Sequence, residues 1–138
     1  MANNFYATKD KIIKWFADWA NLKIQLHFSD RELYFKERQI WWASIGQNIG
    51  SEQNGKHGNF ERTVLVFKKF NKQTFLGIPI STKIKVGNHR YVFSQNGKGF
   101  CLNLSQMRVM SSKRLLRLVG IISTTEYQNI VKIFKEIA

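Results

Sequence analysis

The 138-residue sequence has one cysteine, one proline and no long apolar run. A lone Cys101 excludes an internal disulfide and is typical of a reducing compartment. It lies in the apolar pattern FCLNL, which favours a buried structural thiol over a nucleophile. No stretch approaches the roughly 18 apolar residues that a membrane span requires, and no small-residue cleavage site follows the first turns of the chain. The sequence therefore predicts a soluble, cytoplasmic protein that does not associate with a membrane.

Carboxylates are missing from the middle of the chain. All nine Asp and Glu residues lie within 1–61 or 126–138, whereas residues 62–125 hold twelve Lys and Arg. The charge of that segment, +12, is nearly the whole formal net charge of +13. Cationic side chains without competing carboxylates attract phosphates by Coulomb forces and counterion release. A merely solvated basic surface is the alternative, but the confinement of the excess to one segment favours a nucleic-acid partner.

Metal-ligand spacing is also missing. His27, His57 and His89 are far apart in the sequence, and Cys101 forms no ligand pair with any of them. The basic segment offers no carboxylate to hold Mg²⁺. The sequence predicts no metal site and no other cofactor.

Helical periodicity is present at the two ends of the chain. Residues 9–26 place apolar side chains three and four positions apart, with Thr8 as a candidate N-cap. This amphipathic helix is expected to dock on its own domain or on a second subunit, because mixed Lys and Asp on its other face argue against lipid. At the other end Ser123 and Glu126 form a capping-box pattern that begins a C-terminal helix. Residues 29–37 are interpreted as a connector.

Between the helices, period-two patterns and turn signals replace the helical period. Asn54-Gly55, Gly87-Asn88 and Asn96-Gly97 are the turn signals. Short strands with close turns are typical of a small antiparallel barrel. The expected strands are 39–45, 63–70, 74–80, 89–93, 100–104 and 108–110, with one further short strand after residue 111.

Four segments in one order carry a family resemblance. They are IWWASIGQNIGSEQNGK (40–56), ERTVLVF (61–67), LGIPISTK (76–83) and LSQMRVMSSKRLLRLVGIIS (104–123). Together they resemble the MazF/PemK toxins, small dimeric endoribonucleases that cut single-stranded RNA. The resemblance implies a mainly β fold, an SH3-like barrel over residues 38–138, with residues 1–37 as a helical extension outside it. It also implies a homodimer and a cognate acidic antitoxin.

The resemblance assigns catalytic positions one at a time. Arg62 stands where the family has the arginine of Arg-Pro-Val-Leu-Val, with Thr63 in place of proline. Glu52 matches the carboxylate of Gly-Ser-Glu-Gln. Ser81 takes the place of a hydroxyl residue that is usually threonine, and the adjacent Thr82 leaves open which hydroxyl faces the substrate.

Cleavage by a ribose 2′-hydroxyl needs a base, stabilisation of the phosphorane charge and a proton for the leaving oxygen. Glu52 is the candidate base, Arg62 the charge-stabilising group, and Ser81 a hydrogen-bonding group. His57, in a loop before Arg62, has no family support and is interpreted as an exposed loop histidine. The predicted RNA-binding residues are Ser51, Gln53, Lys56, His57, Thr82, Lys83, Arg90, Gln106 and Arg108.

A second hypothesis is a barrel that binds nucleic acid or a protein partner without catalysis. Its support is the set of departures from the family pattern. Thr63 and Ser81 are two of them, and Asn103 and Ser105 stand where some family members have a catalytic arginine and aspartate. A surface Arg–Glu ion pair, which contributes little, is the corresponding structural reading of Arg62 and Glu52.

Overall fold

A computed structural model describes residues 8–138, so residues 1–7 of the expected N-terminal extension lie outside the described part. Within it, helix α1 (Lys9–His27) is followed by a curled antiparallel sheet and helix α2 (Thr124–Ile137). The strands are β1 (Gln39–Ser44), β2 (Glu61–Lys69), β3 (Thr74–Ser81), β4 (Arg90–Gln95), β5 (Lys98–Asn103), β6 (Arg108–Ser111) and β7 (Leu115–Ile121). Two short 3₁₀ helices, η2 (Leu104–Gln106) and η3 (Ser112–Arg114), flank β6.

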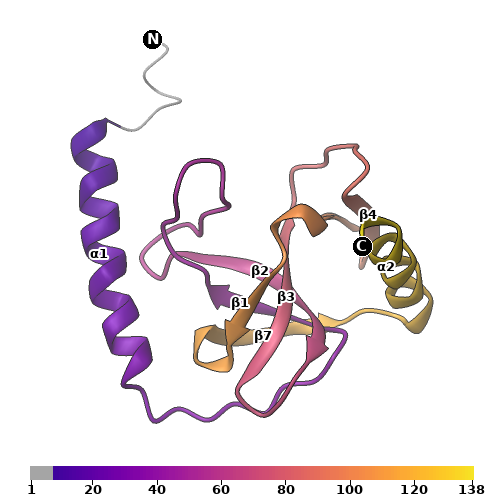
Figure 1. The fold of residues 1–138 in the computed structure, drawn as a ribbon, viewed down its shortest axis with the longest axis horizontal. Coiled ribbons are helices and arrows are strands. Elements are labelled where there is room, and N and C mark those ends of the chain that lie inside the picture. The colour runs from indigo at the N-terminus through magenta and orange to yellow at the C-terminus, as the bar shows by residue number, and fades with distance from the viewer. Residues whose placement is uncertain (1–7) are drawn as a thin grey trace.

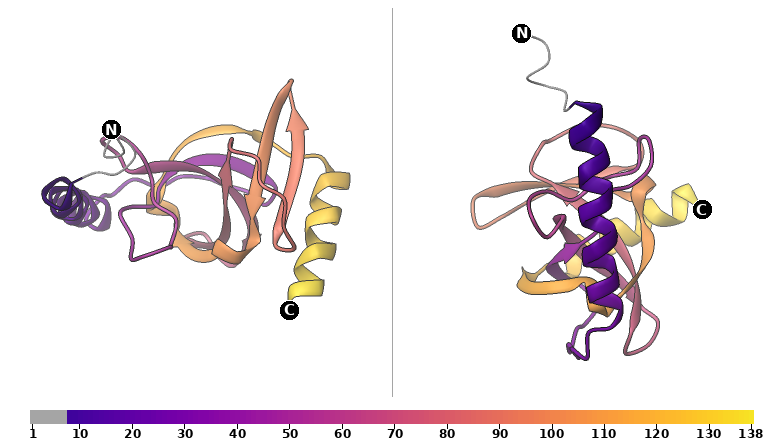
Figure 2. Two further views of the ribbon diagram at one scale, coloured as in Figure 1. Left: turned by 90° about the horizontal axis from the view of Figure 1, so that it is seen from above. Right: turned by 90° about the vertical axis from the view of Figure 1, so that its left-hand side faces the viewer.

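The sheet runs in the order β4-β5-β3-β2-β1-β7, and β6 pairs with β3 outside this path. It curls into a half-barrel, with α1 on one side and α2 on the opposite side (Figures 1 and 2). Register shifts in the β1–β7 pairing and between Val66 and Lys68 of β2 accompany the curl, as bulges bend the strand that carries them. The predicted mainly β fold with a helix at each end is confirmed.

The β4–β5 hairpin differs from its expected limits. Asn96 and Gly97 both have positive φ, 54° and 76°, as a two-residue type I′ turn requires. The strands therefore extend to Gln95 and begin again at Lys98, whereas the sequence patterns placed them at 89–93 and 100–104. Leu104 opens the 3₁₀ helix η2 instead of ending the strand.

Alternation along the central strands divides the apolar side chains into two clusters. The first cluster contains Ile40, Leu65, Phe67, Ile78 and Ile80, and it extends to α2 and β5. Its neighbours along the same strands face the other way and form the second cluster, which contains Trp41, Ala43, Ile45, Val64, Val66, Phe75, Met110 and Leu115. The sheet face of the first cluster is called the closed face below, and that of the second cluster the site face.

Helix α2 covers the closed face. The Ser123 hydroxyl accepts a hydrogen bond from the Glu126 N–H at 3.1 Å, which confirms Ser123 as the N-cap. The reciprocal half of the expected capping box is absent, because the Glu126 carboxylate accepts a hydrogen bond from the Tyr91 hydroxyl. Ile130 of α2 is completely buried.

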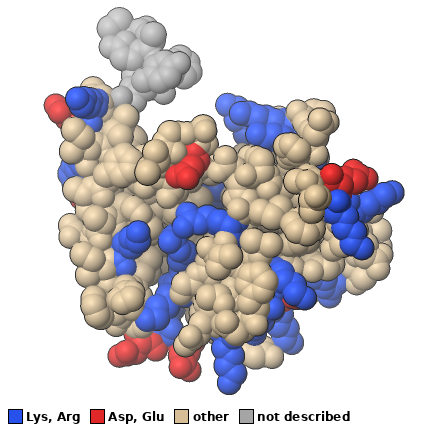
Figure 3. Space-filling model, viewed as in Figure 1, with Lys and Arg blue, Asp and Glu red and all other residues tan. Residues whose placement is uncertain are grey.

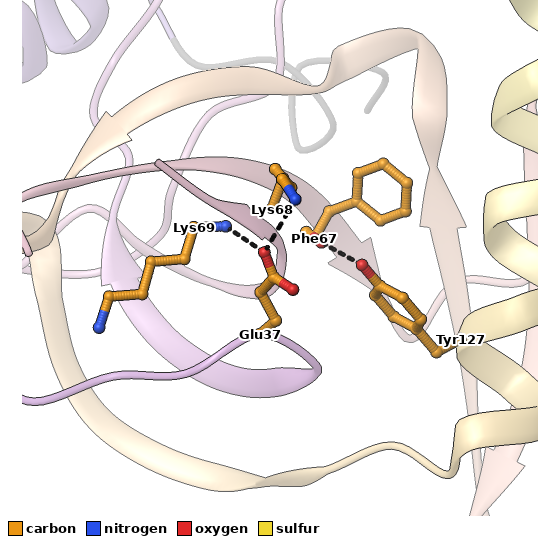
Figure 4. A network of polar contacts seen from close by, with 5 residues as sticks. All are labelled: Glu37, Phe67, Lys68, Lys69 and Tyr127. Carbon is orange, nitrogen blue, oxygen red and sulfur yellow. Dashed lines mark hydrogen bonds and ion pairs between the residues drawn. The ribbon is translucent and has the colours of Figure 1, made fainter. Parts of the chain in front are cut away.

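The connector before β1 is tied to the end of β2 and, through it, to α2. Glu37 Oε2 accepts the Lys69 N–H at 2.8 Å and lies 3.8 Å from Lys68 Nζ (Figure 4). The Tyr127 hydroxyl donates to the Phe67 carbonyl oxygen at 2.7 Å. Burial, followed by the charge of Glu37, raises the pKa of Tyr127. The connector and α2 are thus both hydrogen-bonded to the end of β2.

Helix α1 begins at the predicted N-cap, since the Thr8 hydroxyl accepts the Lys11 N–H at 3.3 Å. It docks on its own domain through a narrower stripe than the sequence indicates. Trp19 is its one buried residue, while Ile13 and Phe16 are exposed. In the described part of the chain, no helix combines the length and the apolar character needed to cross a bilayer.

Candidate active site

The loop between β1 and β2 is pinched at its base, in a region called the neck below. The Phe60 carbonyl oxygen accepts hydrogen bonds from the Ile45 N–H (2.9 Å) and the Gly46 N–H (3.2 Å). Gly46 in turn accepts the Gly55 N–H at 2.8 Å. A Cβ at position 55 would lie 1.7 Å from the Phe60 oxygen, so only glycine permits this approach. The neck divides the loop into a first turn, residues 47–54, and a second turn, residues 56–60.

Side-chain hydrogen bonds to the backbone hold the first turn. Asn48 Nδ2 donates to the carbonyl oxygens of Ile45 (3.2 Å) and Gln53 (2.7 Å). Asn54 Oδ1 accepts the Asn48 N–H at 2.5 Å. Glu52 is exposed on this turn, and its Oε1 accepts the Ile49 N–H at 3.0 Å. The Oε2 atom has no hydrogen-bond partner within residues 8–138 and is available as a base.

Gln106 of η2 clamps the first turn to the sheet. Its Oε1 accepts the Gln53 N–H at 3.1 Å, and its Nε2 donates to the Ser51 carbonyl oxygen at 3.3 Å. One side-chain amide thus hydrogen-bonds to the backbone on both sides of Glu52, as a neighbouring strand would. Two segments more than 50 residues apart in the chain are joined in this way.

Arg62 lies half-buried at the start of β2. Its Nε donates to the Asn54 carbonyl oxygen at 2.9 Å, and its Nη1 donates to that of Ile80 at 3.4 Å. Burial lowers the pKa of its guanidinium, yet an arginine keeps its charge near neutral pH. Two of its five N–H donors are used on the backbone, so others remain for a phosphate.

Ser81 ends β3 directly after Ile80, the residue whose carbonyl Arg62 contacts. The β2–β3 register pairs Val64 with Pro79, and continuing it places Arg62 opposite Ser81. By alternation both side chains belong to the site face. The Ser81 oxygen accepts the Lys83 N–H at 3.0 Å and keeps its own proton to donate. Ser81 is half-buried and Thr82 is exposed.

A pocket of about 500 Å³ opens between the first turn, the end of β3 and β6. Glu52 and Gln53 line it from the loop, and Arg108 lines it from β6. The Gln53 Oε1 atom is buried and has no hydrogen-bond partner in the described residues. The full lining is Ile45, Asn48, Glu52, Gln53, Pro79, Ser105, Gln106, Met107, Arg108 and Met110.

Positive charge gathers beside this pocket. Arg114 Nη1 donates to the carbonyl oxygens of Ser44 (3.1 Å) and Ile45 (3.4 Å). Burial, together with the charge of Arg108, lowers the pKa of Arg114 to about 10. Figure 3 shows a basic group at the centre of one face, between α1 and the sheet. Among the described residues, the ion pairs are Lys14–Asp18, Lys68–Glu37 and Arg117–Glu61.

None of those pairs includes Arg62, Arg108 or Arg114. Each of these guanidiniums therefore lacks a carboxylate partner within residues 8–138, and Arg62 and Glu52 do not form the surface ion pair considered above. Arg108 and Arg114 lie close enough for their charges to interact, and like charges without a counterion favour an anionic ligand.

The other predicted RNA-binding residues do not all meet at the pocket. Lys56 and His57 lie on the exposed second turn, and Thr82 and Lys83 lie on the exposed segment after β3. Arg90 begins β4 opposite Asn103, outside the pocket lining. In the same part of the chain, no group of three His, Cys, Asp or Glu side chains has the geometry of a metal site.

Six aromatic side chains are interleaved with the Lys and Arg residues of the barrel segment and could stack on RNA bases, but most of them are core. Trp41, Phe60, Phe75 and Phe93 are buried, whereas Trp42 and Tyr91 are half-buried. Trp41 is thus the inward member of the Trp41–Trp42 pair. Trp42 lies under Arg117, whose Cζ is 4.9 Å from the ring centre.

Sequence reasoning did not select Arg114, Asn48 or Trp19 as site residues. In the sequence, Arg114 cannot be distinguished from an ordinary surface cation. It is partly buried only because the fold brings it to the carbonyl oxygens at the end of β1. Asn48 stood within the family-like loop, and its role as an internal brace is visible only from its carbonyl partners.

The fold and the site together define a small curled β-sheet protein in which a pocket that includes Arg108 lies beside a braced loop. Residues 36–138 match the model of the PemK-like, MazF-like toxins of type II toxin–antitoxin systems, which is more than half of the chain. The chain belongs to this family. A comparison with curated proteins finds no match.

Proposed function

We propose that this protein is an endoribonuclease that cleaves single-stranded RNA without a metal, the toxin of a toxin–antitoxin pair. The observation that carries the proposal is the position of Arg62. Its half-buried guanidinium touches both the loop that bears Glu52 and the strand end that bears Ser81. One charged group thereby connects the loop of the candidate base with the strand end of the candidate hydroxyl, and of these three residues Glu52 lines the pocket.

The proposed reaction is an internal transesterification. Glu52 accepts the proton of a ribose 2′-hydroxyl, the 2′-oxygen bonds to phosphorus, and the bond from phosphorus to the 5′-oxygen breaks. Arg62 stabilises the charge on the pentavalent phosphorane. Ser81 donates a hydrogen bond to a non-bridging or leaving oxygen, the leaving 5′-oxygen takes a proton from a solvent water, and Glu52 afterwards returns its proton to the solvent. The products are a 2′,3′-cyclic phosphate and a 5′-hydroxyl.

RNA binding is proposed to follow the charge around the site. Arg108 and Gln106 contact the strand at the pocket, and Ser51, Gln53 and Thr82 form its rim. Lys56, His57, Lys83 and Arg90 lie farther out and contact neighbouring phosphates. Since four of the six aromatic side chains considered above are buried, phosphate contacts contribute more than base stacking, and binding weakens steeply with salt.

An acidic antitoxin segment is the proposed inhibitor of the same pocket. Unpaired arginines attract carboxylates as well as phosphates, so the two ligands compete. An acidic peptide should raise the apparent KM for RNA at low salt and lose effect at high salt. A cognate antitoxin that leaves RNA binding unchanged contradicts this mechanism.

A homodimer is the proposed assembly, with an RNA groove that spans two subunits. Edge strand β7 exposes Leu118, Val119 and Ile121, and these apolar side chains support burial against a second copy. Light scattering at tens of micromolar should find a dimer. Full activity of a protein that is monomeric there would exclude a shared groove.

The proposed function is tested with single-stranded RNA, EDTA and two arginine variants. The parent should cleave in EDTA and release 5′-hydroxyl ends. Arg62→Ala should lower kcat by on the order of a hundredfold or more and weaken RNA binding far less. Arg62→Lys should restore little activity, since a point charge lacks the planar fork. Lys98→Ala, which removes an exposed cation from the β4–β5 hairpin, is the control and should cleave like the parent.

Three results would overturn the mechanism. They are loss of activity in EDTA, products that carry 5′-phosphate, and an Arg62→Ala variant that is as fast as the parent. RNA binding by the parent without any cleavage would instead favour the non-catalytic binding barrel.

A further inference from the structure

Helix α1 lies outside the residues that match the family, and Trp19 is its one buried residue. The side chain of Trp19 is 7% exposed. Its indole is packed against Gly46, where a Cβ added to the glycine would lie 2.3 Å from Cε2 of the ring. The ring centres of Trp19 and Phe60 are 5.7 Å apart, with the planes tilted by 56°. Trp19 therefore contacts both residues that close the neck of the loop.

A third contact reaches the neck from the sheet. Arg114 Cζ lies 5.6 Å from the Trp19 ring centre, on the π face that attracts cations. The same guanidinium donates to the carbonyl oxygens of Ser44 and Ile45, which immediately precede the neck. The indole and the guanidinium thus enclose the start of the loop between them.

The remainder of α1 is attached more lightly. Lys113 Nζ donates to the His27 carbonyl oxygen at 2.6 Å at the far end of the helix. Much of the apolar surface of α1 stays exposed, including Ile13 at 56% and Ile24 at 57%. Figure 2 shows the helix along one flank of the domain, away from α2. Its contact with the rest of the fold is thus centred on the Trp19 contacts at the neck.

We propose that Trp19 is a positioning residue, through which α1 holds the neck closed and keeps Glu52 and Arg62 in their reactive arrangement. The link is direct in the structure. The neck fixes both ends of the first turn, Glu52 caps that turn at Ile49, and Arg62 takes its acceptor from Asn54 in the same turn. The catalytic consequence rests on the proposed function, whereas the closure of the neck does not.

Loosening the neck should reduce the rate more than substrate affinity. A general base must meet its proton at hydrogen-bond distance, and small misplacement of reacting groups is costly. Arg108, the proposed RNA contact on β6, stays on the sheet, so the KM for RNA depends less on the loop. We expect Trp19→Ala to lower kcat about tenfold and to change KM less than about threefold.

A second readout does not depend on RNA cleavage. Lys56 lies exposed beside the neck, but its N–H and C=O are both hydrogen-bonded to Glu61, at 2.9 and 3.0 Å. Trypsin needs an extended, unpaired backbone, so cleavage after Lys56 requires the neck to open. Lys98, exposed in the β4–β5 hairpin, provides an internal reference site in the same digest.

The experiment compares the full chain with Trp19→Ala, Trp19→Leu and Trp19→Phe, and with Ile24→Ala as a control on the exposed part of α1. Mass spectrometry follows trypsin cleavage after Lys56 and Lys98, and circular dichroism checks that each variant is folded. Trp19→Ala and Trp19→Leu should speed cleavage after Lys56 at least fivefold relative to Lys98 and lower kcat. Trp19→Phe, which retains a ring beside Phe60 and Arg114, should stay within about twofold of the parent. Ile24→Ala should match the parent.

The outcomes separate this inference from the proposed function. Unchanged protection of Lys56 in folded Trp19→Ala or Trp19→Leu overturns the positioning of the neck. Lost protection with an unchanged kcat, in a parent that cuts RNA, overturns the catalytic consequence. A parent that cuts no RNA refutes the proposed function, and the protection of Lys56 then decides the role of Trp19 by itself.

Discussion

The two faces of the curled sheet use the same strands for opposite purposes. On the closed face, apolar side chains of the central strands continue into α2, whose Ile130 is fully buried. On the site face, the apolar cluster stops at one end, where Arg62 contacts the braced loop and Arg108 lines the pocket beside it. Both faces thus have a buried apolar cluster, but only the site face also carries the candidate catalytic groups.

The site face carries the energetic costs of that division. Burial lowers the pKa of Arg62 and of Arg114, which means that the folded environment disfavours their charged forms. The buried Gln53 Oε1 has no partner among the described residues. Buried polar groups that lack a partner, and cations that are desolvated, reduce stability. Substitutions on the two faces should consequently separate stability from activity.

The largest expected effect is on the closed face. Ile130→Ala should lower the free energy of unfolding by about 2–5 kcal/mol, because it removes buried methyl groups and leaves a cavity. RNA cleavage per folded molecule at 25 °C should remain that of the parent. Urea unfolding and a cleavage assay on the same sample measure the two quantities. A proportional loss of kcat in the folded protein would show that the faces are not independent.

The second largest effect is expected on the site face, where a substitution should lower activity and leave stability almost unchanged. Glu52→Gln keeps an oxygen that can accept the Ile49 N–H and removes the base. We expect kcat to fall about a hundredfold, within the range of general base catalysis, while the melting temperature changes by less than about 2 °C, as for an exposed residue. Calorimetry and initial rates test this pattern. A variant as active as the parent would assign the base to another group.

A smaller loss of activity is expected when the Gln106 clamp on the first turn is removed. Gln106→Ala removes both hydrogen bonds to the first turn and should lower kcat/KM about tenfold, or ~1.4 kcal/mol. Gln128→Ala, on the exposed side of α2, is the control and should have no effect. Steady-state kinetics of the three proteins provide the comparison. Equal kcat/KM values would make the clamp dispensable.

The smallest expected effect is a decrease in the unfolding free energy at alkaline pH, caused by two tyrosines on the closed face. Burial raises the pKa of Tyr91 and of Tyr127 above the ordinary value of 10.0. A raised folded-state pKa means that their contribution is fully present below pH 10 and is lost as the pH rises beyond it. The difference in unfolding free energy between the parent and Tyr91→Phe/Tyr127→Phe should be constant from pH 7 to 9 and shrink above pH 10. Urea titrations at each pH measure it, and a constant difference up to pH 11 would contradict the assignment.

Much of the fold follows from short-range patterns in the sequence. The helical period and Thr8 predict α1, Ser123 predicts the start of α2, and Asn96-Gly97 predicts the tight hairpin. These features depend on residues within a few positions of each other, where steric and hydrogen-bonding preferences act directly. The family resemblance also predicts Arg62, Glu52 and Ser81 as one catalytic set from their order in the chain.

Only the tertiary structure decides which side chains meet. Trp19 and Phe16 have the same apolar character, yet Trp19 is buried at the neck and Phe16 is exposed. The Glu126 carboxylate binds Tyr91 in place of its own N-cap, because β4 passes beside α2. Gln106 braces a loop more than 50 residues away. Each of these contacts depends on the curl and register of the sheet, which result from packing across the whole chain and not from local preference.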